Sequence, residues 1–511
     1  MAEEQGVLLE LEGQARPAEG KREARLRRPE RAQLVMDTID LERMIAPGHL
    51  ARAVWELAGM LPTEGFLAEN KSVEGHAGRP RLCPKMMLSL WVYGYSQGLG
   101  EGHAIAEEMK YEPGLRWLAG NDLICGRSLC EFRVAHAQAL EQVFAELLGI
   151  LARDGLVNLH ELTLDGTKIK AHASSSSRRR EKTLREHVAE AAEAVRTLEN
   201  PHDAAERSAK KLEAQRRGAA ERSRRLQAGL EELQKIRGGK PASQQEQARV
   251  SETDPQARPM KNGEGAYILG YNVQLATETK NKIIVNVAAT QDAADQKQWE
   301  PALHRLAHQP VTVIVDGGYV THDNLVAASA RNVEMIGPAM DIDARIERGR
   351  QASLRSAGIA PEFGPQAFVQ IENGAAVRCP AGQRLPLQGV FDGYQRYRSK
   401  SSDCAACAHR QLCSPQGRRT VKLRCGADER RQIEREFAER MRSEANREQY
   451  KKRGPTAEFP HAWIKEKFGL RQFHVRGLVK VGLEALWVAL AYNIRQWERL
   501  VWRPKLQPAA M

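Results

Sequence analysis

The sequence predicts an α/β fold preceded by an all-helical region, and three patterns carry this prediction. First, apolar residues recur at steps of three and four within residues 37–160, as at Leu140, Phe144, Leu147 and Leu151, which is typical of amphipathic helices. Second, apolar and polar residues alternate in the segment that begins at Leu162, and alternation predicts a strand. Third, the β-branched run Val311–Val315 stops at Asp316-Gly-Gly, as a buried central strand does.

The remaining elements follow along the chain in the same way. Residues 178–238 are rich in Ala, Glu, Arg, Lys and Leu and predict an inserted helical hairpin that turns near Asn200-Pro201. We further expect two strands over Ala266–Ala276 and Lys282–Thr290, helices around Trp299 and over Asn324–Ala330, a short strand over Val333–Ile336, and an amphipathic closing helix from Leu483 to Val501. The predicted organisation is a basic tail (1–36), a helical N-terminal domain (37–160), a first part of an α/β core (161–338), a cysteine-rich insertion (339–430) and a second part of that core (431–502).

The charge balance of the 511 residues indicates a polyanionic partner. Lys and Arg number 77 against 65 Asp and Glu, a formal net charge of +12, and an excess of positive charge favours binding to nucleic acid. The longest apolar run, near Leu483–Ile494, is interrupted by Glu484 and is too short for a bilayer span. The opening MAEEQGVLLELEG lacks the basic start of a secretory signal, so we expect a protein of a reducing compartment.

Three carboxylates are candidates for metal-dependent chemistry. Asp165 lies in the first predicted strand, Asp316 ends a later strand, and Glu458 lies at or just before a helix. Acids brought together at strand ends repel one another unless a cation neutralises them. Two Mg²⁺ ions would resolve that repulsion and support phosphodiester chemistry. Each acid taken singly is also an ordinary turn or helix-start residue.

Other acids compete with these three candidates. They are Glu161, Asp292 and Asp295, and we expect Asp295 to cap the helix that follows it.

The neighbourhood of Glu458 strengthens its candidacy. The spacing Tyr450-x2-Arg453-x4-Glu458-x6-Lys465 would place Glu458 and Lys465 on one face of an unbroken helix, since seven residues are two helical turns. Prolines at 455 and 460 interrupt such a helix, because proline is comfortable only in a first turn.

In combination, these segments resemble the DDE transposases of bacterial insertion sequences, in the subgroup with a helical N-terminal domain and a cysteine-bearing insertion. The stretches that carry the resemblance are Leu162-Thr-Leu-Asp-Gly-Thr-Lys, Gly270-Tyr-Asn-Val-Gln, Val313-Ile-Val-Asp-Gly-Gly-Tyr, Ala457-Glu-Phe-Pro-His-Ala-Trp-Ile-Lys, Gly477-Leu and Ala491-Tyr-Asn, with Leu88–Leu99, Ala104–Glu107, Arg116-Trp-Leu and Phe132-Arg in the N-terminal region. Their order along residues 40–495 is more specific than any one of them.

The resemblance implies a ribonuclease-H-like mixed sheet flanked by helices, with Asp165, Asp316 and Glu458 as the catalytic, metal-binding triad. It implies that Tyr450, Arg453 and Lys465 support the third acid and the DNA ends. It also implies two catalytic Mg²⁺ or Mn²⁺ ions, binding to terminal inverted repeats and target DNA, a homodimer in the complex with DNA ends, and a cytoplasmic, nucleoid-associated location.

Two alternative functions remain open at this point. One is a ribonuclease-H-like nuclease that cleaves DNA without strand transfer. The other is an inactive, domesticated DNA-binding protein, because Ile124-Cys-Gly-Arg-Ser-Leu-Cys-Glu and Glu458-Phe-Pro-His-Ala-Trp depart from the family pattern.

The cysteines of the insertion predict a structural zinc site. Cys379, Cys404, Cys407 and Cys413 have loop spacings suited to tetrahedral Zn²⁺, and Cys425 could substitute for one of these ligands. Buried thiols without a metal are the alternative.

Basic and imidazole side chains complete the candidates. Lys168, Lys170, Lys465 and Arg471 are expected to bind DNA phosphates. His172 and His461 lie near the acids, and we expect both to be ordinary structural or surface histidines.

Overall fold

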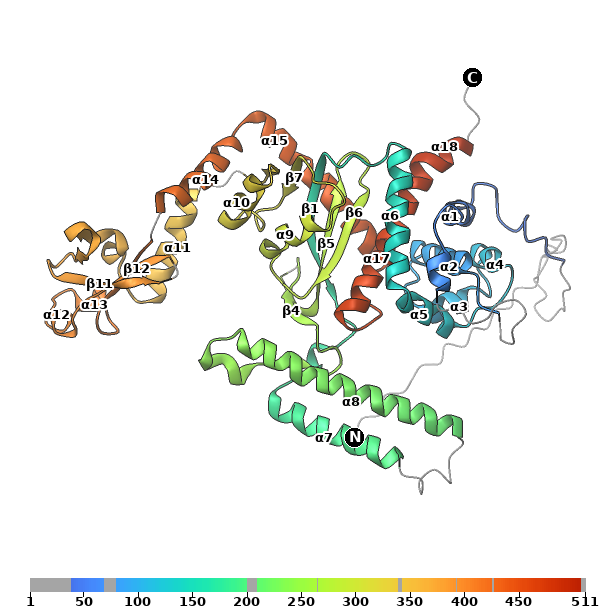
Figure 1. Cartoon of the computed structure of the whole chain (residues 1–511), viewed down its shortest axis with the longest axis horizontal. Coiled ribbons are helices and arrows are strands. Elements are labelled where there is room, and N and C mark those ends of the chain that lie inside the picture. The colour runs from blue at the N-terminus through green and yellow to red at the C-terminus, as the bar shows by residue number, and fades with distance from the viewer. Residues whose placement is uncertain are drawn as a thin grey trace, which may run out of the picture.

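The computed structural model describes residues 38–68, 80–199, 209–263, 265–338, 342–391, 393–424 and 427–506. The predicted basic tail therefore lies outside the described residues. The molecule is elongated, with the N-terminal helices at one end, a mixed sheet in the middle and a small antiparallel sheet at the other end (Figure 1). Within the described ranges, no helix combines the length and apolar composition needed to cross a membrane.

The N-terminal region is helical, as its periodicity predicts. Its helices are α1 (Leu50–Ala58), η1 (Glu64–Leu67), α2 (Pro84–Ser96), α3 (Gly102–Glu108), α4 (Pro113–Leu118), α5 (Gly126–Ala135) and α6 (Ala137–Arg153). Pro84 occupies the first turn of α2, where its missing N–H costs nothing. The stripe of Leu140, Phe144, Leu147 and Leu151 on α6 is buried, which confirms the predicted amphipathic helix.

A mixed sheet forms the centre of the chain. Its strands are β1 (Glu161–Lys170), β4 (Arg258–Lys261), β5 (Tyr267–Glu278), β6 (Ile284–Thr290), β7 (Thr312–Val315) and β8 (Glu334–Ile336). The order is β4-β5-β1-β7-β8, and β6 pairs with the edge of β5 that faces away from β1. Strand β5 is antiparallel to each of its neighbours β4, β6 and β1, whereas β1 is parallel to β7 and β7 is parallel to β8. This mixed α/β arrangement fits the expected ribonuclease-H-like fold.

The two faces of the sheet belong to two apolar cores, because successive side chains of a strand point to opposite faces. Leu269, Tyr271, Val273 and Leu275 of β5 join the larger core with the N-terminal helices and α17 (Leu478–Trp497). Leu162 and Leu164 of β1 join the other core. That second core is completed by α9 (Trp299–His304), which follows the short turn η5 (Asp295–Gln298), and by α10 (His322–Ala330) and α14 (Ala427–Arg440).

The closing helix α17 ties the sheet to the N-terminal helices. It packs on β6, α2 and α6, and η11 (Glu498–Trp502) and α18 (Arg503–Leu506) follow it. Glu484, which interrupts the apolar run in the sequence, is fully buried and lies 3.4 Å from Arg133 of α5. A buried charge is tolerated when it is paired, so this acid is compatible with a core helix.

The predicted helical hairpin consists of α7 (Glu181–Glu199) and α8 (Ala209–Gly238), which pack against each other and project from the sheet (Figure 1). Its predicted turn lies outside the described residues. Short elements surround the hairpin: η2 (Ser175–Ser177), β2 (Arg178–Arg179), η4 (Ala242–Gln247) and β3 (Val250–Ser251).

The cysteine-rich segment has more regular structure than its sequence pattern indicates. It contains an antiparallel sheet of β9 (Val369–Ile371), β10 (Ala376–Arg378), β11 (Arg384–Phe391), β12 (Tyr394–Arg398) and β13 (Thr420–Arg424). Around the sheet lie α11 (Ile342–Ser356), η6 (Pro361–Phe363), η7 (Pro365–Ala367), η8 (Glu372–Gly374), α12 (Ser401–Ala405) and α13 (Arg410–Cys413). Its apolar core is small, with Phe368, Val377, Leu385, Tyr397 and Val421.

The chain then returns to the central sheet through a series of short helical segments. They are α15 (Glu444–Lys451), η9 (Gly454–Glu458), α16 (Phe459–Ala462) and η10 (Trp463–Lys467). Segments η9 and η10 are π-helical, so the spacing of seven residues between Glu458 and Lys465 does not correspond to two α-helical turns. Turns of this kind are frequent at functional sites.

Candidate active site

Asp165 and Asp316 lie on neighbouring parallel strands. The last register pair of β1 and β7 is Leu164 with Val315, so the two aspartates directly follow paired residues. Asp165 is 13% exposed and Asp316 is 34% exposed. The backbone N–H of Gly318 donates to Asp316 Oδ1 at 2.8 Å and holds that carboxylate at the strand end. The structure therefore brings together two of the three predicted acids.

The guanidinium of Arg453 lies between these two carboxylates. Its Nη2 is 3.2 Å from Asp165 Oδ2 and 4.0 Å from Asp316 Oδ2. A cation within this distance offsets the repulsion between two carboxylates that share a site.

Burial dominates the electrostatics of Asp165. It raises the pKa of the Asp165 carboxyl to about 6, against the positive charge of Arg453 and together with the negative charge of Asp316. Protons therefore compete with a cation for this carboxylate as soon as the solution becomes mildly acidic.

Helix α15 is held against the sheet by contacts at the start of β1. Gln449 Nε2 donates to Glu161 Oε2 at 2.6 Å, and Lys452 Nζ lies 3.1 Å from Glu161 Oε1. Glu161, a competing acid in the sequence, thus has a structural role. Tyr450 on the same helix is half-buried, and its pKa is raised by burial and by the charges of Asp316 and Asp165.

Glu458 differs from the two aspartates because its side chain is exposed at the end of η9. Its carboxylate lies over Gly454, where an added Cβ would be 4.0 Å from Oε1. Across the described parts of the chain, no group of three or more His, Cys, Asp or Glu side chains is gathered closely enough to hold a metal ion. Glu458 therefore does not join the two aspartates in a closed group in this structure.

His461 lies closer to Asp165 than its sequence context indicates. Its Nε2 is 3.7 Å from Asp165 Oδ2, and both ring nitrogens are buried without a hydrogen-bond partner. Burial, followed by the positive charges of Lys465, Arg453 and Lys168, lowers the pKa of His461 to about 3. The expectation of an ordinary, satisfied histidine is wrong here. Its only sequence signal is a polar residue three positions after the predicted acid.

The opposite face of β1 and β5 carries a polar network. Asp295 accepts hydrogen bonds from Asn272 Nδ2 at 2.6 Å and from Gln274 Nε2 at 2.7 Å, and it pairs with Lys168 Nζ at 2.9 Å. The oxygen of the Gln274 amide accepts from the hydroxyl of Tyr319.

This network corrects one prediction for Asp295. The helical turn that begins there has Ala294 at its N-cap and no side-chain cap bond, so Asp295 faces the sheet rather than capping the turn. The alternation Asn272-Val-Gln274, two polar residues on one face of a strand, is the signal that would have located the network.

The predicted phosphate-binding residues have different surroundings. Lys168 is engaged by Asp295, and Arg471 lies 2.5 Å from Glu466. Lys465 is partly buried, and its pKa is lowered by burial and by the charges of Arg471 and Lys168. Lys170 is exposed beside a polar groove with Arg476.

The four predicted zinc ligands line one cavity. Cys379, Cys404, Cys407 and Cys413 all border it, and burial and the other three thiols raise the pKa of Cys413. Gln383 N donates to Cys379 Sγ at 3.3 Å. The four sulfurs converge on one volume but are not gathered as tightly as bound metal would hold them.

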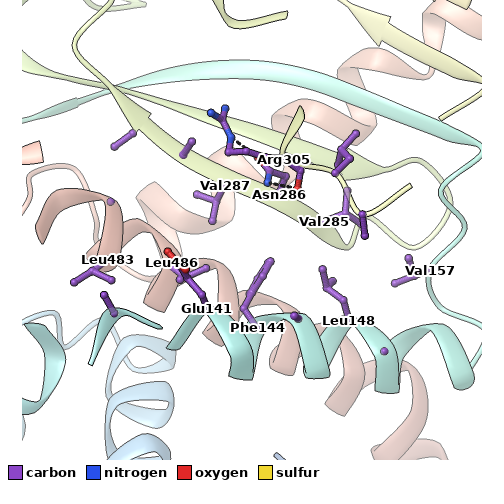
Figure 2. Close-up of a pocket in the computed structure, with 18 of the residues that line it drawn as sticks. Glu141, Phe144, Leu148, Val157, Val285, Asn286, Val287, Arg305, Leu483 and Leu486 are labelled. Carbon is purple, nitrogen blue, oxygen red and sulfur yellow. Dashed lines mark hydrogen bonds between the residues drawn. The ribbon is translucent and has the colours of Figure 1, made fainter. Parts of the chain in front are cut away.

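A large groove of about 830 Å³ lies away from both sites. Figure 2 shows it between α6, which carries Phe144 and Leu148, and strand β6, which carries Val285 and Val287. The groove contains none of the predicted site residues, and its lining is mainly apolar.

Comparisons with known families match two separate segments of the chain. Residues 378–497 match the family described as "Transposase DDE domain", and residues 39–135 match the family described as "Transposase domain (DUF772)". The first match includes Tyr450, Arg453 and Glu458 and begins after both aspartates. The comparison with curated proteins finds no relative.

The two matches indicate a class of enzyme: transposases, which cleave DNA and transfer strands with the help of divalent metal ions. More particularly, both matched segments are similar to transposase families, which supports a DDE transposase of an insertion sequence with DNA transposition as its function.

Proposed function

We propose that the protein hydrolyses the phosphodiester bonds at the 3′ ends of its own element and then joins each 3′-hydroxyl to target DNA. Asp165, Asp316 and Glu458 are the catalytic acids in this proposal. The observation that carries it is the pair of aspartates that follow the last paired residues of β1 and β7 and share the Arg453 guanidinium.

The donor set suits Mg²⁺ or Mn²⁺. These ions prefer oxygen ligands and are usually held by one or two carboxylates together with substrate phosphates. When bound, two such ions lower the pKa of an attacking water and stabilise the leaving oxygen. Orphaned polar atoms on Arg453 (Nε) and His461 beside Asp165 support a site that is completed by a further charged group.

The residues of the chain have distinct roles in this proposal. Asp165 and Asp316 hold the cations at the strand ends. Arg453 neutralises the two carboxylates before the cations and DNA bind and contacts a phosphate afterwards, since guanidinium binds both groups well. Glu458, nearby on η9 and exposed to solvent, turns toward the aspartates when DNA binds. Lys170, Lys465 and Tyr450 contact the DNA backbone, with Lys168 and Arg471 at the margin.

The proposal is tested by alanine variants of the three acids. The substrates are oligonucleotides that carry the inverted repeats bordering the coding region. Asp165→Ala, Asp316→Ala and Glu458→Ala are expected to abolish Mg²⁺-dependent cleavage while retaining DNA binding in a gel-shift assay. The control is Glu448→Ala, because Glu448 lies on the same helix as Tyr450, is exposed, and forms an ion pair with its helix neighbour Lys451. If one of these variants cleaves DNA as well as wild type, the replaced residue is not a catalytic acid.

A strand-transfer assay separates transposition from the two alternatives. A transposase yields cleaved ends joined to target DNA, a nuclease yields only cleaved ends, and a domesticated DNA-binding protein yields neither. We propose joined product, formed by a homodimer that holds two ends, in a protein that is cytoplasmic and nucleoid-associated on DNA.

We also propose that Cys379, Cys404, Cys407 and Cys413 bind a structural Zn²⁺ ion. The small apolar core of this segment supports the proposal, because a metal contributes folding energy where a core is limited. One zinc per chain is expected by elemental analysis, and Cys407→Ser should lose it and make the segment sensitive to protease. Cys83→Ser is the control, because Cys83 is an exposed thiol in the N-terminal region. Zinc-free protein with an intact segment would contradict the proposal.

A further inference from the structure

The imidazole of His461 has no partner, although it is buried beside the proposed metal-binding acids. Only 9% of the residue is exposed, and neither ring nitrogen makes a hydrogen bond. A buried polar group without a partner costs free energy, and at functional sites such groups are commonly completed by an ion, water or substrate.

The neighbours of His461 restrict what its partner can be. Lys465, Arg453 and Lys168 are the nearby positive charges, and Asp165 and Asp295 are the nearby negative ones. A neutral imidazole has one nitrogen with a free lone pair. That nitrogen accepts a hydrogen bond or coordinates a metal ion.

The distance between His461 and Asp165 favours a metal ion. At 3.7 Å, Nε2 and Oδ2 are too far apart for a hydrogen bond. Two ligands at about 2.1 Å from one ion lie about 3.0 Å apart at a right angle and about 3.6 Å apart at 120°. A small side-chain adjustment therefore brings both atoms onto one cation.

The helical register explains why this residue reaches the site. His461 on α16 is buried toward the face of β1 that carries Asp165, whereas Glu458 at the end of the π-helical segment η9 is exposed. Asp165 pairs in register with Leu275, which belongs to the apolar core on the same face as Ile464. The segment that carries Glu458 thus also places the imidazole of His461 beside Asp165.

We propose that His461 Nε2 is a ligand of the divalent cation bound by Asp165, in addition to the carboxylate ligands. This inference rests on the proposed function of the acids. A nitrogen ligand suits Mn²⁺ better than Mg²⁺, because Mg²⁺ is bound almost exclusively through oxygen. The site should therefore prefer Mn²⁺.

The test measures Mn²⁺ binding to the full chain without DNA. Electron paramagnetic resonance distinguishes free from bound Mn²⁺ and gives the Kd, and its pulsed form detects a coordinated imidazole through nitrogen-14 modulation. The wild-type protein should show this modulation. In His461→Ala the modulation should disappear and the Kd should rise at least about tenfold, as expected for loss of a ligand.

Further variants separate the possible outcomes. His461→Gln offers an amide oxygen in place of the ring and should bind Mn²⁺ without nitrogen modulation, even if the smaller alanine disturbs the fold. His308→Ala, at an exposed histidine, should behave as wild type.

Three results would overturn the inference. If the nitrogen modulation is absent from the wild type, or persists in both His461 variants, His461 is not a ligand. In these two cases, loss of Mn²⁺ binding in Asp165→Ala would still support the proposed acid site. If Asp165→Ala binds Mn²⁺ as well as wild type, the proposed site and the inference both fail.

Discussion

The pH dependence of metal binding follows from the burial of Asp165. The pKa of this carboxyl is raised to about 6, and a metal ion binds only the ionised form. The affinity is therefore fully present only well above pH 6 and is lost as the pH falls through this value. At about pH 5 the Kd should be about 11-fold higher than at pH 7.5, whereas an ordinary aspartate would change it by about a tenth.

Manganese binding measured by electron paramagnetic resonance across this range checks the prediction. His461 does not contribute to the change, because its pKa of about 3 lies below the range. Replacement of Arg453 by Gln removes the cation that lowers the pKa of Asp165, so the midpoint should move to higher pH. A Kd that is constant from pH 7.5 to pH 5 would refute the link between burial and metal affinity.

Two further predictions concern packing around the site and the joint between the sheet and the N-terminal helices. Gly166→Ala places a Cβ 2.2 Å from an amide nitrogen and 2.4 Å from a carboxylate oxygen of the polar network, and should lower the free energy of unfolding by about 1–3 kcal/mol. Gly149→Ala is the control, with nothing within 4 Å, and equal urea midpoints for the two variants would contradict the packing argument. Glu484→Ala leaves the buried charge of Arg133 without its carboxylate partner, which typically costs about 3–5 kcal/mol. Calorimetry should show a marked loss of stability, unlike that of Glu107→Ala at an exposed ion pair, and an unchanged melting temperature would rule out a structural role.

The regular elements of the central region could be predicted because their patterns reflect burial directly. The β-branched run before Asp316 is the buried strand β7 (Thr312–Val315), and the alternation from Leu162 is β1. The hairpin of β5 and β6 likewise agrees with the predicted strands. In each case one short segment of sequence contains the apolar side chains that are buried, so its local pattern is enough to predict the strand.

The strands of the cysteine-rich segment could not be predicted from the periodicity of the sequence. These strands are mostly exposed, and in β11 (Arg384–Phe391) Pro386 and a register shift between Leu387 and Gly389 interrupt the regular strand pattern, so their side chains leave only a weak periodic signal. The sheet is instead specified by hydrogen bonds between strands and by a few buried residues such as Tyr397 and Val377. Contacts between distant segments cannot be derived from local periodicity.

The site was predictable in residue type but not in arrangement. Asp165 follows from the predicted strand that contains it and Asp316 from a strand end, whereas the position of Arg453 between them depends on packing of α15 against β1. The exposed Glu458 ends the π-helical segment η9, and the buried His461 lies on α16, which follows it directly. A shift of one residue in helical register exchanges the side chains that face a site, and the sequence pattern carries no signal for such a shift.

Asp165, Asp316 and Glu458 are proposed to bind the divalent cations that the enzyme needs to cleave DNA. Anomalous diffraction from crystals of the protein with terminal-repeat DNA and Mn²⁺ tests this proposal most directly. We predict Mn²⁺ peaks at about 2.2 Å from carboxylate oxygens of Asp165 and Asp316, with Glu458 turned toward the same ions. Peaks elsewhere, or a Glu458 that stays in solvent beside the bound scissile phosphate, would contradict the account.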